Sequence, residues 1–167
     1  MELALLLPLL LLLFLAIADF ARLYTTMLSV ESAAREAADF GAFNSSNWQG
    51  SSADPSSNHA KTLSQMATRA CVAARSLPDY DDPDNDPATG CNNPAMVVEL
   101  IEPSPGTDCS VKTNDPPCRV KVTLTHTFDL IAPMNITAFG TQLGLPSQVT
   151  FSRSSIFAIS DYGVDAP

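Results

Sequence analysis

Hydrophobic residues are concentrated in one uninterrupted block at the start of the chain. Leu3–Ala18 contains sixteen residues without a charge, and a helix of this length covers about 24 Å. Phe20, Ala21 and Leu23 extend this apolar reach toward the ~30 Å of a bilayer core. Secretory signals carry basic residues before their apolar region, and this block has none. We therefore predict that residues 1–22 are a retained transmembrane anchor, with a cleaved secretory signal as the competing interpretation.

Beyond the anchor, small and apolar residues recur at spacings of three and four. These positions are Leu23, Met27, Val30, Ala34, Ala37 and Gly41. The period is that of a helix with one packing stripe, so we predict that residues 23–43 continue the anchor helix outside the membrane. The stripe suits either a partner helix or the chain's own domain, and the sequence leaves both open. Leu23, Met27, Val30, Ala34 and Ala37 are accordingly candidate assembly residues.

Two acidic residues lie within or beside the apolar block. An unpaired carboxylate in hydrocarbon costs about 2–3 kcal/mol, so Glu2 and Asp19 each need an interface or a cation. For Glu2 the candidates are the chain's own amino terminus and that of a neighbour. For Asp19 they are Arg22, one turn on, or a cation of a partner helix. Alternatively, the two acidic residues mark the headgroup regions. Glu2, Asp19 and Arg22 complete the candidate assembly set.

Residues 44–167 are predicted to form a separate head. A loop rich in Ser, Asn and Gly leads to an amphipathic helix over His59–Leu77, capped by Ser57 or Asn58 and stopped by Pro78.

Three later segments have the pattern of strands. They are Met96–Glu102, Arg119–Leu130 with strict alternation, and Gln148–Ser160 with a bulge near Ser154. Pro133–Pro146 is predicted to be a short helix or turn. Helices followed by antiparallel strands make an α+β fold, in which a small sheet covers the end of the long helix.

Charge and motifs narrow the classes of function. Nine basic against eighteen acidic residues give a net charge of −9, which disfavours a nucleic-acid partner. The acidic loop Asp79–Asp86 has aspartates at alternate positions, as in calcium loops, but Pro87 stands where such a loop needs Gly. A solvated acidic loop is the favoured interpretation. His126, on the apolar face of a strand, is predicted to be a buried and hydrogen-bonded structural residue.

No motif of a hydrolase, a nucleotide site, a haem site or a zinc site is present. We therefore predict a protein that is not an enzyme and has no catalytic residue, cofactor or metal.

Four cysteines, all after the anchor, favour disulfides and hence an oxidising compartment. Sequence order alone does not decide their pairing. We favour Cys109–Cys118, closing the loop before the long strand, and Cys71–Cys91, joining the acidic loop to the second helix. Because basic residues near the anchor are few, the predicted orientation rests on these cysteines: a cytoplasmic N-terminus and a head outside.

The amino-terminal block resembles that of TadE-like proteins, the pseudopilins of bacterial tight-adherence pili. A glutamate, Glu2, precedes an apolar run with an internal proline, Pro8, and is followed by Asp19-Phe-Ala-Arg and Glu31-Ser-Ala-Ala-Arg-Glu-Ala-Ala. The resemblance covers roughly Glu2–Ala42. It implies a pilin-like head and a non-enzymatic structural subunit, a minor pilin of the bacterial inner membrane with its head periplasmic or extracellular. Membrane lipid and other membrane-embedded helices are the implied partners.

One feature departs from the family pattern. TadE-like pseudopilins normally carry a short leader with a glycine at the peptidase site, whereas only Met1 precedes Glu2 here. Either the natural start lies upstream, or the chain keeps Met1 and serves elsewhere. In the second case the alternative is an accessory subunit of a larger membrane complex, respiratory or photosynthetic.

Overall fold

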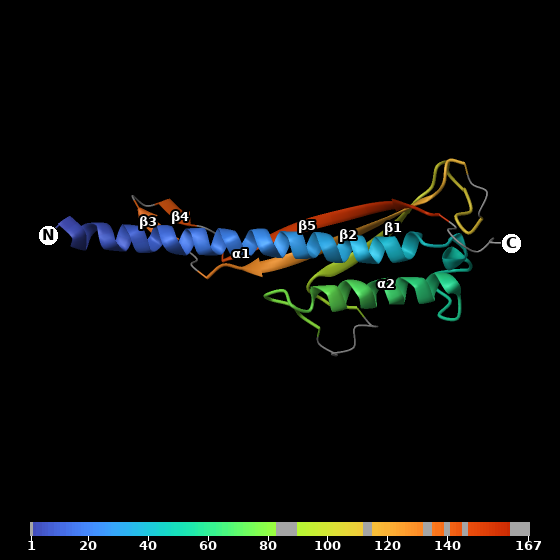
Figure 1. Ribbon diagram of the computed structural model, residues 1–167, viewed down its shortest axis with the longest axis horizontal. Helices are drawn as coiled ribbons and strands as arrows, with labels where there is room; N and C mark the ends of the chain where they lie inside the picture. Colours follow the sequence, from blue (N-terminus) through green and yellow to red (C-terminus); the bar gives the residue numbers. More distant parts are fainter. Residues whose placement is uncertain are drawn as a thin grey trace.

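The computed structural model describes residues 2–82, 90–111, 115–131, 135–138, 141–144 and 147–160. Side chains are described for all of these except residues 2–5, residue 8 and the two short strands at 135–138 and 141–144. A 41-residue helix, α1 (Glu2–Ala42), runs along the long axis, and the other helices and the three-stranded sheet lie beside its C-terminal half (Figure 1). This confirms the predicted α+β fold.

A short turn returns the chain along α1. The 3-10 helix η1 (Ser45–Trp48) follows α1, and the Trp48 indole N–H donates to the Gly41 carbonyl at 2.9 Å. The second helix, α2 (Asn58–Ala74), begins after Ser57, whose hydroxyl accepts the Ala60 N–H as an N-cap. It ends three residues before the predicted Leu77, because the Arg75 and Leu77 amides bond three residues back and tighten the last turn.

The head contains one antiparallel sheet with β2 at its centre. The strand order is β1 (Ala95–Ile101), β2 (Arg119–Asp129), β5 (Gln148–Ala158). In β2 every second residue is buried, as its alternation predicts. These inward residues are Val120, Val122, Leu124, His126 and Phe128. Both β2 and β5 contact α1.

The predicted bulge near Ser154 is wrong. The β2–β5 register runs without interruption from Arg119 opposite Ala158 to Asp129 opposite Gln148. Ile156 therefore lies on the outer face and is 51% exposed, while Phe157 packs against the core. Leaving one Ile side chain exposed costs less free energy than leaving unpaired the backbone groups that a bulge would take out of the ladder.

The prediction of a short helix or turn over Pro133–Pro146 is also wrong. The described part of that segment holds two strands, β3 (Asn135–Ala138) and β4 (Thr141–Gly144), paired antiparallel. The Leu130 amide donates to the Ser147 carbonyl at 3.0 Å, so both ends of the segment meet at the end of the main sheet. This closure favours a hairpin over a helix, since the chain must leave and return at one point.

The core lies where the small residues of α1 meet the sheet and α2. Five residues of α1 are fully buried there: Val30, Ala33, Ala34, Ala37 and Ala38. Gly41 extends this close approach, because a Cβ at that position would lie 2.7 Å from Met66 Sδ of α2. The alanine-rich stripe thus lets helix and sheet pack at short distance.

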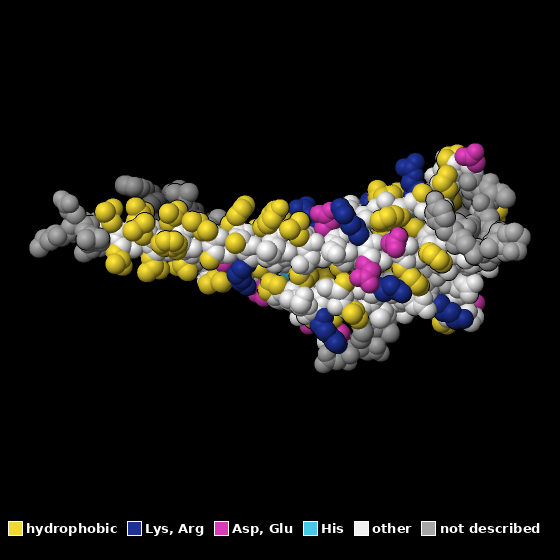
Figure 2. Space-filling model, in the orientation of Figure 1, with side chains coloured by type: hydrophobic (Ala, Val, Ile, Leu, Met, Phe, Trp, Pro, Cys, Tyr) yellow, Lys and Arg dark blue, Asp and Glu magenta, His cyan; other side chains and the backbone are white. Residues whose placement is uncertain are grey.

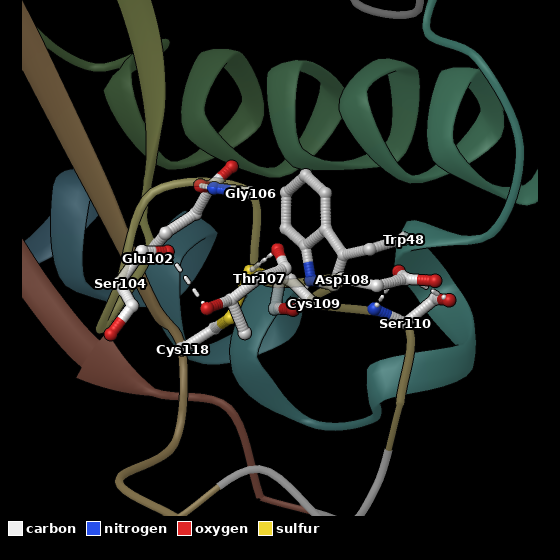
Figure 3. Close-up of a disulfide and its surroundings, with 10 residues drawn as sticks. Trp48, Glu102, Ser104, Gly106, Thr107, Asp108, Cys109, Ser110 and Cys118 are labelled. Atoms are coloured by element: carbon white, nitrogen blue, oxygen red, sulfur yellow. Dashed lines mark hydrogen bonds between the residues drawn. A yellow bond between two sulfur atoms is a disulfide. The ribbon is translucent and has the colours of Figure 1, made fainter.

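Both favoured cysteine pairings are present: Cys71–Cys91 and Cys109–Cys118. Figure 3 shows Cys109–Cys118 beside Trp48, holding the loop between β1 and β2. Within that loop the Thr107 hydroxyl donates to the Ser104 carbonyl at 2.7 Å, and the hydroxyl and amide of Ser110 donate to Asp108 Oδ1 (Figure 3). The two hydrogen bonds from Ser110 lower the pKa of Asp108.

Candidate functional site

The first half of α1 is an exposed apolar surface. By length and composition, α1 is the one helix in the described part of the chain that could cross a membrane, with the apolar window found within Leu9–Ala42. Apolar side chains cover most of the surface of the first half of α1 (Figure 2). The exposed apolar residues up to Asp19 are Leu6, Leu7, Leu9, Leu10, Leu11, Leu12, Leu13, Phe14 and Ile17. Such a surface needs lipid or other helices around it.

Among the described side chains of α1, Asp19 is the first that is buried. This carboxylate is 7% exposed, and its Oδ1 accepts the backbone N–H of Ile131 at 3.2 Å. Arg22 Nη1 lies 3.5 Å from the same oxygen, and the Arg22 guanidinium stands 5.0 Å from the centre of the Phe128 ring. Of the partners expected for Asp19, the structure therefore supplies Arg22, and it adds a backbone amide 112 residues away in sequence.

Residues of the predicted packing stripe face the chain's own head. Val30, Ala34 and Ala37 are fully buried in the core, whereas Leu23 and Met27 are half-buried. Arg153 Nη2 lies 3.3 Å from Met27 Sδ, so β5 also covers this part of the helix. Of the two occupants that the sequence left open, the structure places the chain's own sheet on this stripe. The side chain of Glu2 lies outside the described residues.

A second surface of α1 escaped the sequence analysis. Phe20, Tyr24 and Leu28 are 70%, 56% and 50% exposed and continue the apolar surface past Asp19. The sequence could have indicated this surface, because a regular spacing of four residues places the three side chains along one side of the helix. The apolar surface stops at the exposed ion pair between Glu31 and Arg35. We name Phe20, Tyr24 and Leu28 the outer stripe.

His126 is fully buried, as predicted. The Pro78 carbonyl acts on its ring, but within the described residues neither ring nitrogen forms the expected hydrogen bond with good geometry. Its ring packs edge-on to Phe151, with the ring centres 5.7 Å apart. Burial lowers the pKa of His126, and the Pro78 carbonyl and the Asp79 carboxylate oppose this shift only in part. The residue is thus a core group held neutral by its surroundings.

The described part of the acidic loop is bonded to the sheet. Asp79 Oδ2 accepts the Asp129 N–H at 2.9 Å, and Asn93 binds Thr127. Together with Asp81 these residues line an open cleft of about 400 Å³. Among the described residues, no three His, Cys, Asp or Glu side chains are placed to hold a metal ion. Asp84 and Asp86 of the calcium-like pattern lie outside the described part of the chain.

Comparison with known proteins gives one match, to a family model. Residues 1–39 match the model described as TadE-like protein. The match confirms the resemblance over the exposed half of α1, Asp19, the outer stripe and most of the helix that the head covers. No curated protein and no solved structure matches the chain. The TadE-like segment and the apolar helix together fit a pilus-related membrane protein.

Proposed function

We propose that this chain is a non-enzymatic, single-pass membrane protein that acts as a TadE-like minor pilin. Residues 1–22 are the anchor, residues 23–43 continue the helix, and residues 44–167 form the head on the periplasmic or extracellular side of the bacterial inner membrane. One observation carries the proposal: among the described residues the head buries α1 from Asp19 onward, whereas the apolar side chains before Asp19, within the TadE-like segment, are largely exposed.

The disulfides support the orientation. All four cysteines are paired, so the chain has no free thiol. Disulfides persist in oxidising compartments and are rare in the cytosol. A head on the far side of the inner membrane satisfies this requirement, and the N-terminus of the anchor then lies in the cytoplasm.

The outer stripe is the contact surface for neighbouring helices in this proposal. Phe20, Tyr24 and Leu28 continue the exposed apolar surface past Asp19, and Tyr24 and Leu28 lie beyond residue 22, where the proposed anchor ends. Exposed apolar groups in a continuous line are typical of an interaction surface. Glu2 sets the axial position by pairing with a neighbour's amino terminus, and Leu23 and Met27 flank the contact.

Charge substitutions in the outer stripe test the proposal on the full chain in its native membrane. Tyr24→Asp and Leu28→Asp are expected to reduce the other pilus proteins that co-purify in mild detergent, with membrane insertion unchanged. Val72→Asp on α2 and Ile156→Asp on β5 are matched controls, because these side chains are exposed to a similar extent on the head. Unchanged co-purification in both stripe variants would contradict the assigned surface.

Mass determination of the native amino terminus separates the proposal from its alternative. A chain that begins near Glu2 and co-purifies with pilins supports the pilin assignment. A chain that retains Met1 and co-purifies with a respiratory or photosynthetic complex would replace it with the accessory-subunit assignment.

A further inference from the structure

The end of the main sheet directs the chain toward the anchor. β2 begins near the C-terminal end of α1, where the Ser160 amide bonds the Ala42 carbonyl and the Ile159 amide bonds the Cys118 carbonyl. It ends near Asp19, which accepts the Ile131 N–H. β2 therefore runs antiparallel to α1, and a chain that continues past Ile131 moves toward the N-terminal, apolar half of the helix.

The β3–β4 hairpin, residues 135–138 and 141–144, lies in that direction. Along the long axis of the molecule it stands beyond the end of β2, at the level of the N-terminal half of α1 (Figure 1). The Leu130–Ser147 hydrogen bond closes its base, and Ile131 at the base is 60% exposed. The main sheet thus ends, and the hairpin begins, at the boundary of the predicted membrane span.

The sequence of this segment suits a membrane surface. Residues 130–152 contain no Asp, Glu, Lys, Arg or His, although charged residues make up 16% of the chain. The β3–β4 register pairs Ile136 with Leu143 and, on the next rung, Thr137 with Gln142. The apolar pair thus lies between Asn135–Gly144 and Thr137–Gln142, and the ladder ends with Ala138 opposite Thr141.

We propose that the β3–β4 hairpin is a second membrane contact, resting in the headgroup region of the outer leaflet beside the anchor. The partner is the lipid bilayer itself. The hydrocarbon core is excluded, because the outer edges of a two-stranded hairpin leave backbone groups unpaired and these groups need water or headgroups. The Asp19–Ile131 hydrogen bond and the Arg22 pair then hold the head at a set height above the bilayer. This inference rests on the proposed membrane anchor.

Fluorophore accessibility tests the contact on the full chain in phosphatidylcholine vesicles. All native cysteines are paired, so one added cysteine is the single free thiol and takes an environment-sensitive fluorophore. The labelled variants are Leu143→Cys in the hairpin, Leu13→Cys in the anchor and Ile156→Cys on the outer face of the head. Each is quenched in turn by iodide in water and by lipid that carries a nitroxide on the part of its acyl chain next to the headgroup.

The label at position 143 is expected to lose fluorescence to the nitroxide lipid and to be protected from iodide, as is the label at position 13. The label at position 156 is expected to respond to iodide alone. If position 13 responds to lipid and position 143 responds to iodide, the hairpin contact is wrong and the anchor stands. If position 143 responds to neither, a protein surface covers the hairpin and the lipid contact is equally wrong. If position 13 responds to iodide, the anchor and the proposed function fail together.

Discussion

Asn93 binds Thr127 as a neighbouring strand would. Its side-chain Oδ1 accepts the Thr127 N–H at 2.9 Å, and its Nδ2 donates to the Thr127 carbonyl at 2.8 Å. The β1–β2 ladder ends at Ala95 opposite Thr125, and the same register continued by two positions would place Asn93 opposite Thr127. One amide side chain therefore replaces a rung of backbone pairing and fastens the end of the acidic loop to the sheet.

Replacement Asn93→Ala is expected to destabilise the head by about 1–3 kcal/mol, because it leaves both backbone groups of Thr127 without this partner. Urea unfolding of the full chain in detergent micelles measures the loss, and amide exchange at Thr127 localises it. Asn92→Ala is the matched control, since the Asn92 side chain is exposed and, among the described residues, donates to Asp81 and does not contact the sheet backbone as Asn93 does. Equal losses in the two variants would contradict the assigned role.

The stability of the head is expected to depend on pH through His126. Burial holds its pKa below the ordinary value of about 6.5. Above about pH 6.5 both folded and unfolded chains carry a neutral ring, and the full stability is present. As the pH falls below this value the unfolded chain binds a proton that the folded chain does not, so stability decreases until the folded pKa is reached.

Urea midpoints measured at about pH 7.5 and pH 5.5 check the direction of this dependence. The variant His126→Phe keeps an aromatic ring beside Phe151 and removes the titrating group, so its midpoint is expected to fall less between the two pH values. Parallel curves for the two proteins would show that other groups cause the dependence.

Loss of the Asp19 carboxylate is expected to loosen the end of the sheet. Asp19→Ala removes the acceptor of the Ile131 N–H and the partner of Arg22. The expected cost is about 1–3 kcal/mol, because Asp19 is nearly buried and Arg22 partly so. Exchange at the Ile131 amide is expected to accelerate, while exchange at Val122 in the middle of β2 stays slow. The exposed pair Glu31–Arg35 offers a control, since Glu31→Ala is expected to cost only about 0.5 kcal/mol.

Removal of either disulfide is expected to destabilise the head. In the chain-entropy account, opening the Cys71–Cys91 loop, with its ends 20 residues apart, costs about 3 kcal/mol. The Cys109–Cys118 loop spans 9 residues, so its loss is expected to cost somewhat less. Paired Cys→Ser variants and denaturant unfolding measure the difference. Thiol labelling of the denatured, unreduced native protein is expected to find no thiol, and four reactive thiols would contradict the proposed orientation.

Neutralisation of Glu2 is expected to weaken assembly and to leave insertion intact. Glu2→Gln removes the charge that would pair with a neighbour's amino terminus, so less partner protein is expected in detergent pull-downs. Fractionation of the membrane checks that the anchor is still inserted. If Glu2→Gln and Asp19→Asn both leave assembly unchanged, these charges mark the membrane boundary and the outer stripe carries recognition alone.

Local pattern was sufficient to predict the long helix, an N-cap at Ser57 or Asn58 and the alternation of β2, and the structure shows that Ser57 is the cap. Each depends on periodicity or on one side chain near its own backbone. The structure of Pro133–Pro146 was predicted wrongly, because its apolar spacing is compatible with a helix or a turn as well as with a hairpin. The hairpin is favoured by the hydrogen bond between Leu130 and Ser147, which lie on either side of the segment.

The sequence by itself determined that a long apolar helix precedes an α+β head with four cysteines, because charge distribution, period and composition are properties of neighbouring residues. Tertiary structure alone decided which face of α1 is exposed and can contact another protein. The chain's own sheet covers the predicted packing stripe, whereas the outer stripe, Phe20, Tyr24 and Leu28, remains exposed. Both stripes have helical spacing, and only the packing of residues far apart in the sequence removes one of them from solvent. Only tertiary structure could likewise show that Asp19 binds the backbone N–H of Ile131, because the two residues are 112 positions apart in sequence.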